Sequence, residues 1–310
     1  MGKIATRDAY GKALKEFGTD ERIVVLDADL SKSTKTATFR DAFPERHFNM
    51  GIAEGNMMSV AAGLASTGKV VFASSFAVFA TGRAFEQIRN SICYPEMNVN
   101  VAASHAGITV GEDGATHQSI EDIAIMRSLP NMRVMCPCDA VETRFCVRSA
   151  IDIEGPVYIR LGRLAVDEFY DANQKFEFGK GIMLRDYGDD VTIVATGLMV
   201  QKSALAVEIL RANGINAKLV DIHTIKPIDK DILVDCAKKT GKIVTVEEHN
   251  IIGGLGGAVC EALAENYPCR VKRIGMNDTF GKSGTPDELL KMFGLDEESI
   301  AKTVTEFVRG

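Results

Sequence analysis

The chain has 310 residues, of which 46% are hydrophobic and 25% are charged, and its net charge at pH 7 is −6. These are ordinary values for a globular protein, and the length suffices for two domains that each have a core. The acidic balance argues against nucleic acid as a partner, and no apolar run approaches the ~20 residues that a membrane span requires.

The N-terminal segment and the cysteines indicate the compartment. Residues 1–14 follow an amphipathic helix pattern and lack the apolar core of a signal peptide. The seven cysteines are an odd number and lie mostly in apolar segments, so we expect buried free thiols in a reducing cytoplasm. The one close pair, "CPC" at 136–138, lacks the second pair of ligands that a zinc site would need.

In the first half of the chain, apolar runs typical of strands alternate with segments typical of helices. The predicted strands are 22–30, 69–76, 97–104, 132–137 and 156–162. The predicted helices are 53–66, 83–94, 119–130, which Pro130 ends, and 139–151, which Asp139 caps. This alternation indicates a mostly parallel sheet with helices on both faces, which binds ligands beyond the carboxyl ends of its strands.

Residues 166–186 interrupt the alternation with mixed charged and aromatic residues, and we interpret them as a linker. The pattern then resumes, with strands at 190–197, 216–224, 242–249 and 269–275 and helices at 199–214, 229–241 and 254–267. We therefore predict an α/β protein of two domains, 1–165 and 187–310, each with a mostly parallel sheet flanked by helices.

A glycine-rich turn at 251–259, "IIGGLGGAV", follows a strand and opens a helix, as in dinucleotide-binding proteins. Its spacing does not fit, because Val259 stands at the third glycine position. Close packing of the backbone at a strand-helix turn is the better interpretation.

Three other features lie where ligands are expected. The loop "HAGITVGEDGATHQ" at 105–118 is compatible with a metal site, a catalytic loop or a tight turn. Glu54, at a helix start, is either a charge favoured by the helix dipole or a buried acid with a raised pKa. Phe76 and Phe79 lie past a strand end, where they could be core residues or could stack on a ligand.

Four segments carry a specific resemblance to a known family: "GIAEGNM" at 51–57, "FASSFAVF" at 72–79, "RAFEQIR" at 83–89 and "VGEDGATHQSIEDIAIMRSLPNM" at 110–132. Their order and spacing resemble the pyrimidine-binding domain of transketolase over residues 1–165. The remainder resembles the transketolase C-terminal domain, so the similarity covers essentially the whole chain.

The resemblance implies thiamine diphosphate as cofactor and assigns roles to matching residues. Glu54 matches the glutamate that hydrogen-bonds the aminopyrimidine ring and so manages a proton of the cofactor. Phe79 matches the aromatic residue that stacks on the pyrimidine, Phe76 lines the same pocket, and Asp29 lies in a loop near the cofactor.

The resemblance also implies a phosphorylated sugar substrate. His117 and Asp113 match residues that contact substrate hydroxyls near the reacting carbons. The matches to the sugar-phosphate clamp provide cations and a hydroxyl, as a phosphate dianion requires. They are Arg7, Ser33, His105 and Arg163.

Two departures from the family pattern matter. Gly82 stands where a third aromatic residue is common, and Phe85 is expected to fill part of that gap. The chain has no GDG motif and begins at the pyrimidine-binding domain, so we expect Mg²⁺ or Ca²⁺ to be held by oxygen ligands of another chain. The resemblance therefore implies the C-terminal subunit of a split transketolase, forming the two-fold core of a heterotetramer with an N-terminal subunit.

Three alternatives stay open. Deoxyxylulose-phosphate synthase has a similar THQ loop but generally an arginine in place of His105. The β subunit of 2-oxo-acid dehydrogenases shares the architecture but lacks the GEDGxTHQ loop. A non-catalytic binding or scaffolding protein is the third, although Glu54 and both loop histidines are present.

Overall fold

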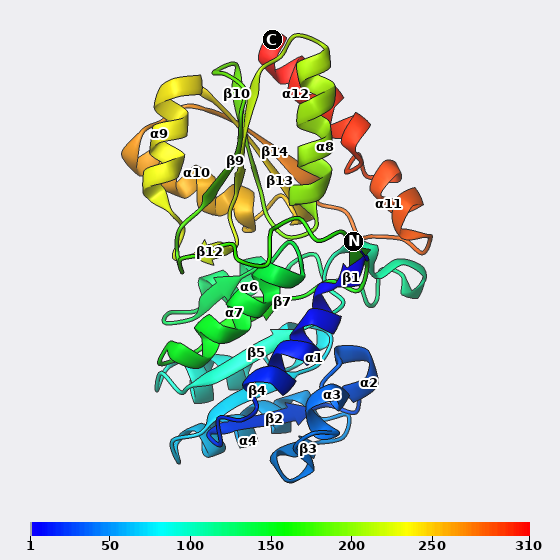
Figure 1. Ribbon diagram of the computed structural model, residues 1–310, viewed down its shortest axis with the longest axis vertical. Coiled ribbons are helices and arrows are strands. Elements are labelled where there is room, and N and C mark those ends of the chain that lie inside the picture. Colours follow the sequence, from blue (N-terminus) through cyan, green and yellow to red (C-terminus); the bar gives the residue numbers. More distant parts are fainter. Residues whose placement is uncertain (1) are drawn as a thin grey trace.

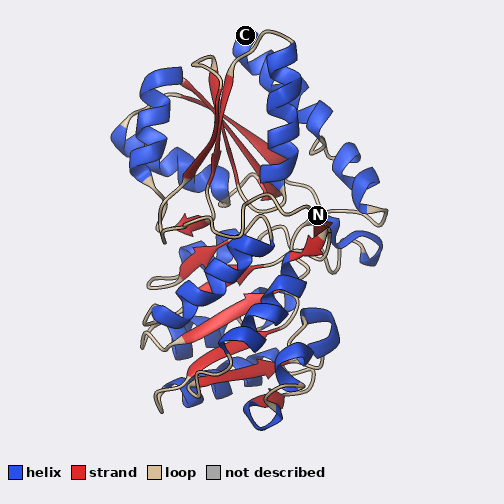
Figure 2. Ribbon diagram, viewed as in Figure 1, coloured by secondary structure: helices blue, strands red, loops and turns tan. Residues whose placement is uncertain are grey.

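The computed structural model describes residues 2–310, which form two α/β domains that follow one another along the long axis (Figure 1). Each domain has one sheet between layers of helices (Figure 2). This confirms the predicted fold class. None of the helices within residues 2–310 has the length and apolar character needed to span a membrane.

The first sheet has seven strands in the order β12-β6-β7-β5-β4-β2-β3, of which all but β12 are parallel. Its strands are β2 (Ile23–Asp27), β3 (His47–Asn49), β4 (Val70–Ser74), β5 (Val99–Ala103), β6 (Arg133–Met135), β7 (Val157–Arg160) and β12 (Thr224–Lys226). Since β12 comes from the C-terminal half of the chain, this pairing ties the two domains together.

Helices cover both faces of this sheet, and the longer ones bury apolar residues against it. The helices are α1 (Thr6–Phe17), α2 (Ser31–Thr34), α3 (Ala37–Arg40), η1 (Pro44–Arg46), α4 (Glu54–Ala65), α5 (Phe85–Gln87), η4 (Ile108–Asp113), α6 (Asp122–Ser128) and α7 (Ala140–Asp152). Tyr10 and Val147 belong to the core on the face of α1 and α7, whereas Met57 belongs to the core of the other face, which continues into the second domain.

The helix predicted over 83–94 has an unexpected form. The chain is helical from Ala77, with wide π turns at η2 (Phe79–Arg83) and η3 (Ile88–Cys93) on either side of α5. Turns of this kind are often found at functional sites.

The second sheet has the order β14-β13-β10-β11-β9, and only β9 is antiparallel. Its strands are β9 (Ile182–Asp186), β10 (Val191–Ala195), β11 (Ala217–Asp221), β13 (Lys242–Asn250) and β14 (Arg270–Met276). Its helices are α8 (Met199–Ala212), α9 (Lys230–Thr240), α10 (Leu255–Asn266), α11 (Pro286–Met292) and α12 (Glu297–Arg309).

The expected linker over 166–186 contains structure at both ends. At its start, β8 (Ala165–Val166) pairs with β1 (Ile4–Ala5) next to the first sheet. At its end, β9 is hydrogen-bonded to β11, so this strand belongs to the second sheet rather than to a linker. The sequence did not predict this strand, because an edge strand is exposed on much of its surface and can contain charged residues.

Candidate active site

The candidate functional groups gather at the carboxyl edge of the first sheet. There β2, β4 and β5 end side by side, and the loops that follow them lie close to the start of α1. In open α/β sheets, ligands bind in the crevice outside the carboxyl ends of the strands, where the connections to neighbouring strands diverge.

Glu54 is the first residue of α4, and only 4% of its surface is exposed. It thus stands at a helix N-terminus, where the helix dipole favours a negative charge, and it is buried. Its contacts are loose: the Ser75 hydroxyl lies 3.5 Å from Oε1, and Nη1 of Arg83 lies 3.3 Å from Oε1 and 3.5 Å from Oε2. These long contacts leave acceptor capacity for a closer donor.

Arg83 is a site residue that the sequence reasoning missed. The wide π turn of η2 brings its guanidinium carbon to 4.0 Å from the centre of the Phe79 ring, while its Nη1 reaches Glu54. Arg83 is the first residue of the "RAFEQIR" segment, and this motif was the feature of the sequence that could have indicated its role. Gly82 faces open space, and Phe85 packs against the core.

Phe76, Phe79 and the two loop histidines form one aromatic group. The Phe76 ring stacks on His105 with centroids 3.7 Å apart, and Phe79 lies 5.8 Å from Phe76 in a stacked arrangement. His117 meets the edges of both phenylalanines, at 6.3 Å and 5.4 Å. The loop of residues 105–118 and the turn after β4 are thus packed together.

His105 is held in a conformation that few residues other than glycine adopt, with a φ of 60°. Its Nδ1 contacts the Ser104 hydroxyl at 2.9 Å, and its Nε2 lies 3.1 Å from Nη1 of Arg7. Burial, and then the neighbouring Arg7, lower the pKa of His105 to about 3. The imidazole is therefore neutral at physiological pH, and its Nε2 accepts from Arg7.

The structure brings three of the four residues of the expected clamp into contact. Nη1 of Arg7 donates to the backbone oxygen of Ser33 at 3.1 Å as well as to His105. Arg163 lies close enough to Arg7 for its charge to lower the Arg7 pKa, after the larger effect of burial. Arg163 itself donates to the Val110 oxygen and pairs with Glu112 at 3.1 Å.

The two aspartates of the expected site lie at its exposed margin. Asp29 follows β2 with a φ of 64° and is held by Asn49, whose amide nitrogen donates to Oδ1 at 2.9 Å. Asp113 ends η4 and is exposed. His117 is half-buried, and its Nδ1 contacts the Thr116 hydroxyl at 3.0 Å.

The loop of residues 105–118 rests on the second domain, through residues that the sequence reasoning did not select. The Thr109 hydroxyl donates to Oε1 of Glu248 at 3.0 Å, and the Gln118 amide donates to the Lys282 oxygen at 2.8 Å. Burial raises the pKa of Glu248 to about 7, and Arg160 and Thr109 oppose that rise. Two consecutive acids in the apolar strand "KIVTVEEH" were the signal.

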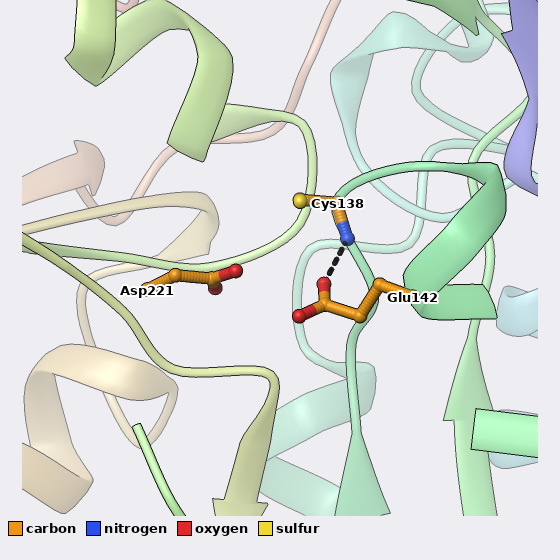
Figure 3. A group of neighbouring side chains, drawn as sticks. All are labelled: Cys138, Glu142 and Asp221. Atoms are coloured by element: carbon orange, nitrogen blue, oxygen red, sulfur yellow. Dashed lines mark hydrogen bonds between the residues drawn. The ribbon is translucent and has the colours of Figure 1, made fainter. Parts of the chain in front are cut away.

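After β6, farther along the same edge, Cys138, Glu142 and Asp221 meet at the junction of the two domains (Figure 3). All three are buried, and their polar atoms lie within 4.8 Å of one another. Burial, and then the charge of Asp221, raise the pKa of Glu142 well above its usual range. Because two carboxylates this close in a dry site disfavour joint ionisation, the pair holds a proton.

The cysteines agree with the expectation of free thiols. All seven are unpaired; five are buried, and Cys260 and Cys269 are half-buried.

Comparisons with known proteins identify two family models along the chain. Residues 2–168 match the pyrimidine binding domain of transketolase, and residues 179–300 match the transketolase C-terminal domain.

Individual relatives agree with these family models. The chain is 55% identical over 304 residues to "Putative transketolase C-terminal section" of Methanocaldococcus jannaschii, covering 97% of this chain and 95% of that protein. It is 40% identical over 306 residues to human transketolase, covering 97% of this chain but only 49% of the human protein. It matches a solved split-gene transketolase, an inactive β4 tetramer, with a TM-score of 0.92 and 57% identity over 99% of both chains.

Proposed function

The chain belongs to the transketolase family as the C-terminal section of a split enzyme, and we propose that it supplies half of an active site for ketol transfer between sugar phosphates. The observation that carries this proposal is the continuous group formed by Glu54, Arg83, the aromatic rings and Arg7 at one sheet edge. In this group an acid and aromatic rings, which suit the cofactor, lie next to a cation, which suits the substrate phosphate.

The residues at the Glu54 end fit the aminopyrimidine of thiamine diphosphate. A buried carboxyl group with only long contacts suits a ring nitrogen donor. The half-buried Phe79 provides an aromatic ring for stacking when the Arg83 guanidinium, which lies 4.0 Å from the ring centre, is displaced. When bound, the cofactor supplies the carbon nucleophile that carries the two-carbon unit. Glu54 would hold the ring nitrogen and its proton, and Phe76 and Phe79 would orient the ring and exclude water.

The residues at the Arg7 end fit the phosphate of a sugar phosphate. Arg7 and Arg163 provide positive charge, and Ser33 provides a hydroxyl. When Arg7 turns to a ligand, Nε2 of the neutral His105 can donate in its other tautomer, in which Nδ1 accepts from the Ser104 hydroxyl. Between the two ends, His117 and Asp113 would contact the substrate hydroxyls. Asp29 would border the cofactor.

The other half of the site is proposed to lie on an N-terminal subunit. The chain aligns with about half of human transketolase, and the related split-gene chain is described as inactive when it forms a β4 tetramer. Within residues 2–310, the one group of ligand-type side chains with metal spacing lies at the domain junction, away from Glu54. We therefore assign Mg²⁺ or Ca²⁺ and the diphosphate to the partner, with a homodimer of this chain at the core of a heterotetramer.

The cytoplasm is the compartment that we propose, because seven free thiols suit a reducing environment.

Co-expression with an N-terminal subunit that bears a GDG motif tests the proposal. We expect the two chains to co-purify and, with thiamine diphosphate and Mg²⁺, to transfer ketol groups between ketose and aldose phosphates. Turnover of pyruvate with glyceraldehyde phosphate would instead assign a synthase, and oxidative decarboxylation of a 2-oxo acid a dehydrogenase. Failure to bind thiamine diphosphate with or without the partner would leave a scaffolding protein.

A further inference from the structure

The loop of residues 105–118 is fastened at both of its ends. Gly107 N–H donates to the Ser119 oxygen at 2.8 Å, and Ala106 pairs with Ser119 in an isolated parallel bridge. The segment between them therefore projects as a closed loop, with His105 just outside one fastening point and His117 just inside the other. Its position on the sheet edge depends on what supports this neck.

The support comes from the second domain, at Glu248 near the end of β13. The Glu248 carboxylate accepts from the Thr109 hydroxyl at 3.0 Å. It also lies against the Cα of Gly107, so closely that a Cβ there would fall 1.6 Å from Oε1. Gly107 has a φ of 81°, so both its backbone conformation and its lack of a side chain belong to this contact.

The same residue reaches the other end of the loop through Arg160. Nη2 of Arg160 donates to the backbone oxygen of Glu248 at 2.8 Å and to that of Ser119 at 3.4 Å. Its Nε donates to Asp122 at 2.8 Å, which fixes the guanidinium. The carboxyl group of Glu248 thus supports residues 107 and 109, and its carbonyl group is tied to residue 119.

The Glu248 carboxyl group borders a small cavity that mixes apolar and polar side chains. Glu248 and Thr109 line a cavity of about 30 Å³, together with Thr6 and Arg160. Oε2 of Glu248 has no hydrogen-bond partner among the described residues. A cavity of this size next to an unpaired carboxylate oxygen has room for an ordered water, which would complete the support.

We propose that Glu248 is a positioning residue that holds the 105–118 loop from the second domain and thereby sets the placement of His105 and His117 at the substrate. This assignment gives the C-terminal domain a part in substrate recognition through the loop, and it rests on the proposed function. It predicts that loss of the carboxylate loosens the loop and weakens sugar-phosphate binding, without altering the proton chemistry at Glu54.

Glu248→Ala tests the proposal through two readouts. In the full chain, amide hydrogen exchange over residues 106–118 is expected to accelerate about tenfold, because the hydrogen bond from Thr109 is lost. In the complex with its partner, KM for the sugar phosphate is expected to rise about tenfold while kcat stays within about twofold. Glu248→Gln is expected to restore most of both, since its amide oxygen still accepts from Thr109.

Glu247→Ala is the matched control. Glu247 is the preceding residue and is equally buried, but its carboxylate accepts from the amides of Leu255 and Gly256 at the start of α10. This variant should lose stability without changing loop exchange or KM. If Glu248→Ala fails to fold, Thr109→Val removes the same hydrogen bond from the loop side.

Unchanged loop exchange and KM in Glu248→Ala would overturn the proposal, as would an equal rise in KM in Glu247→Ala. Hydrogen exchange can be measured without turnover, so it tests the support of the loop separately from the proposed function. If exchange responds as expected but the wild-type complex transfers no ketol group, the proposed function fails while the support of the loop stands.

Discussion

Two groups of charged residues in this molecule differ in how completely they are bonded. At the sheet edge, Glu54 is held by contacts of 3.3–3.5 Å, and its partner Arg83 is half exposed. At the domain junction, Asp122 and Arg160 are both buried, with a contact of 2.8 Å. Tyr158 donates to the same carboxylate at 2.7 Å.

This difference distinguishes residues that can bind a ligand from residues that stabilise the fold. Although burial opposes it, Arg160 keeps the pKa of Asp122 below its usual range, so this pair is ionised and complete. The polar atoms at the sheet edge are under-bonded, and a ligand can complete them at little cost. Substitution of Glu54 should therefore change function, whereas substitution of Asp122 should above all change stability.

The largest functional effect is expected from Glu54→Gln. An amide cannot manage the cofactor proton, so turnover of the complex should fall at least ~10²-fold while assembly is unchanged. Steady-state kinetics and size-exclusion chromatography check both parts. Glu86→Gln, at an exposed position on α5, is the control and should behave as wild type. Near-normal turnover in Glu54→Gln would remove Glu54 from its assigned role.

The largest stability effect is expected from Asp122→Asn. It leaves the Arg160 charge buried without its partner, which typically costs about 3–5 kcal/mol of unfolding free energy. Asp152→Asn breaks an ion pair to Arg148 in which both side chains are 51% exposed, and should cost at most ~1 kcal/mol. Urea denaturation of the two variants measures the contrast, and equal losses would contradict it.

A smaller functional effect is expected from Arg7→Ala. Removing a charged donor from the phosphate should raise KM for a sugar phosphate roughly 10- to 100-fold. An unphosphorylated ketose should show no such change. Arg144→Ala, on the exposed side of α7, is the control. A KM rise that is equal for both substrates would place Arg7 outside the phosphate clamp.

The smallest effect concerns the dependence of stability on pH. The folded pKa of Glu142 lies above its unfolded value, so the native state keeps a proton that the unfolded chain releases, and stability falls as pH rises. Glu142→Gln keeps a donor toward Asp221 and removes this titration. Between about pH 5 and about pH 8, the free energy of unfolding of Glu142→Gln, measured by urea denaturation, should therefore fall less than that of wild type. Glu154→Gln, which is exposed, should follow wild type; an unchanged slope in Glu142→Gln would refute the shared proton.

Much of the fold could be predicted from local patterns. Runs such as that of β2, with every residue buried, and caps such as Asp139, whose side chain accepts from Glu142 N–H, are encoded within a few residues. Strand β9 could not be predicted, because its place in the second sheet depends on pairing with β11. The π turn at Phe79–Arg83 is likewise invisible to apolar periodicity.

The candidate site also has features that the sequence could predict and features that it could not. Glu54, Phe76 and His105 could be located because each stands at an element end in a motif of the family. The neutral state of His105 follows from burial beside Arg7, which lies 98 positions away along the chain. The contact of Glu248 with Gly107 joins two domains, and sequence spacing contains no information about it.

The central claim, that this chain holds half of an active site, is tested most directly by ketol transfer assays of the purified chain with and without an N-terminal subunit. Thiamine diphosphate, Mg²⁺ and a phosphorylated donor and acceptor are present in both assays. We expect no turnover by the chain alone and turnover when the partner is added. Substantial ketol transfer by the chain alone would contradict the account.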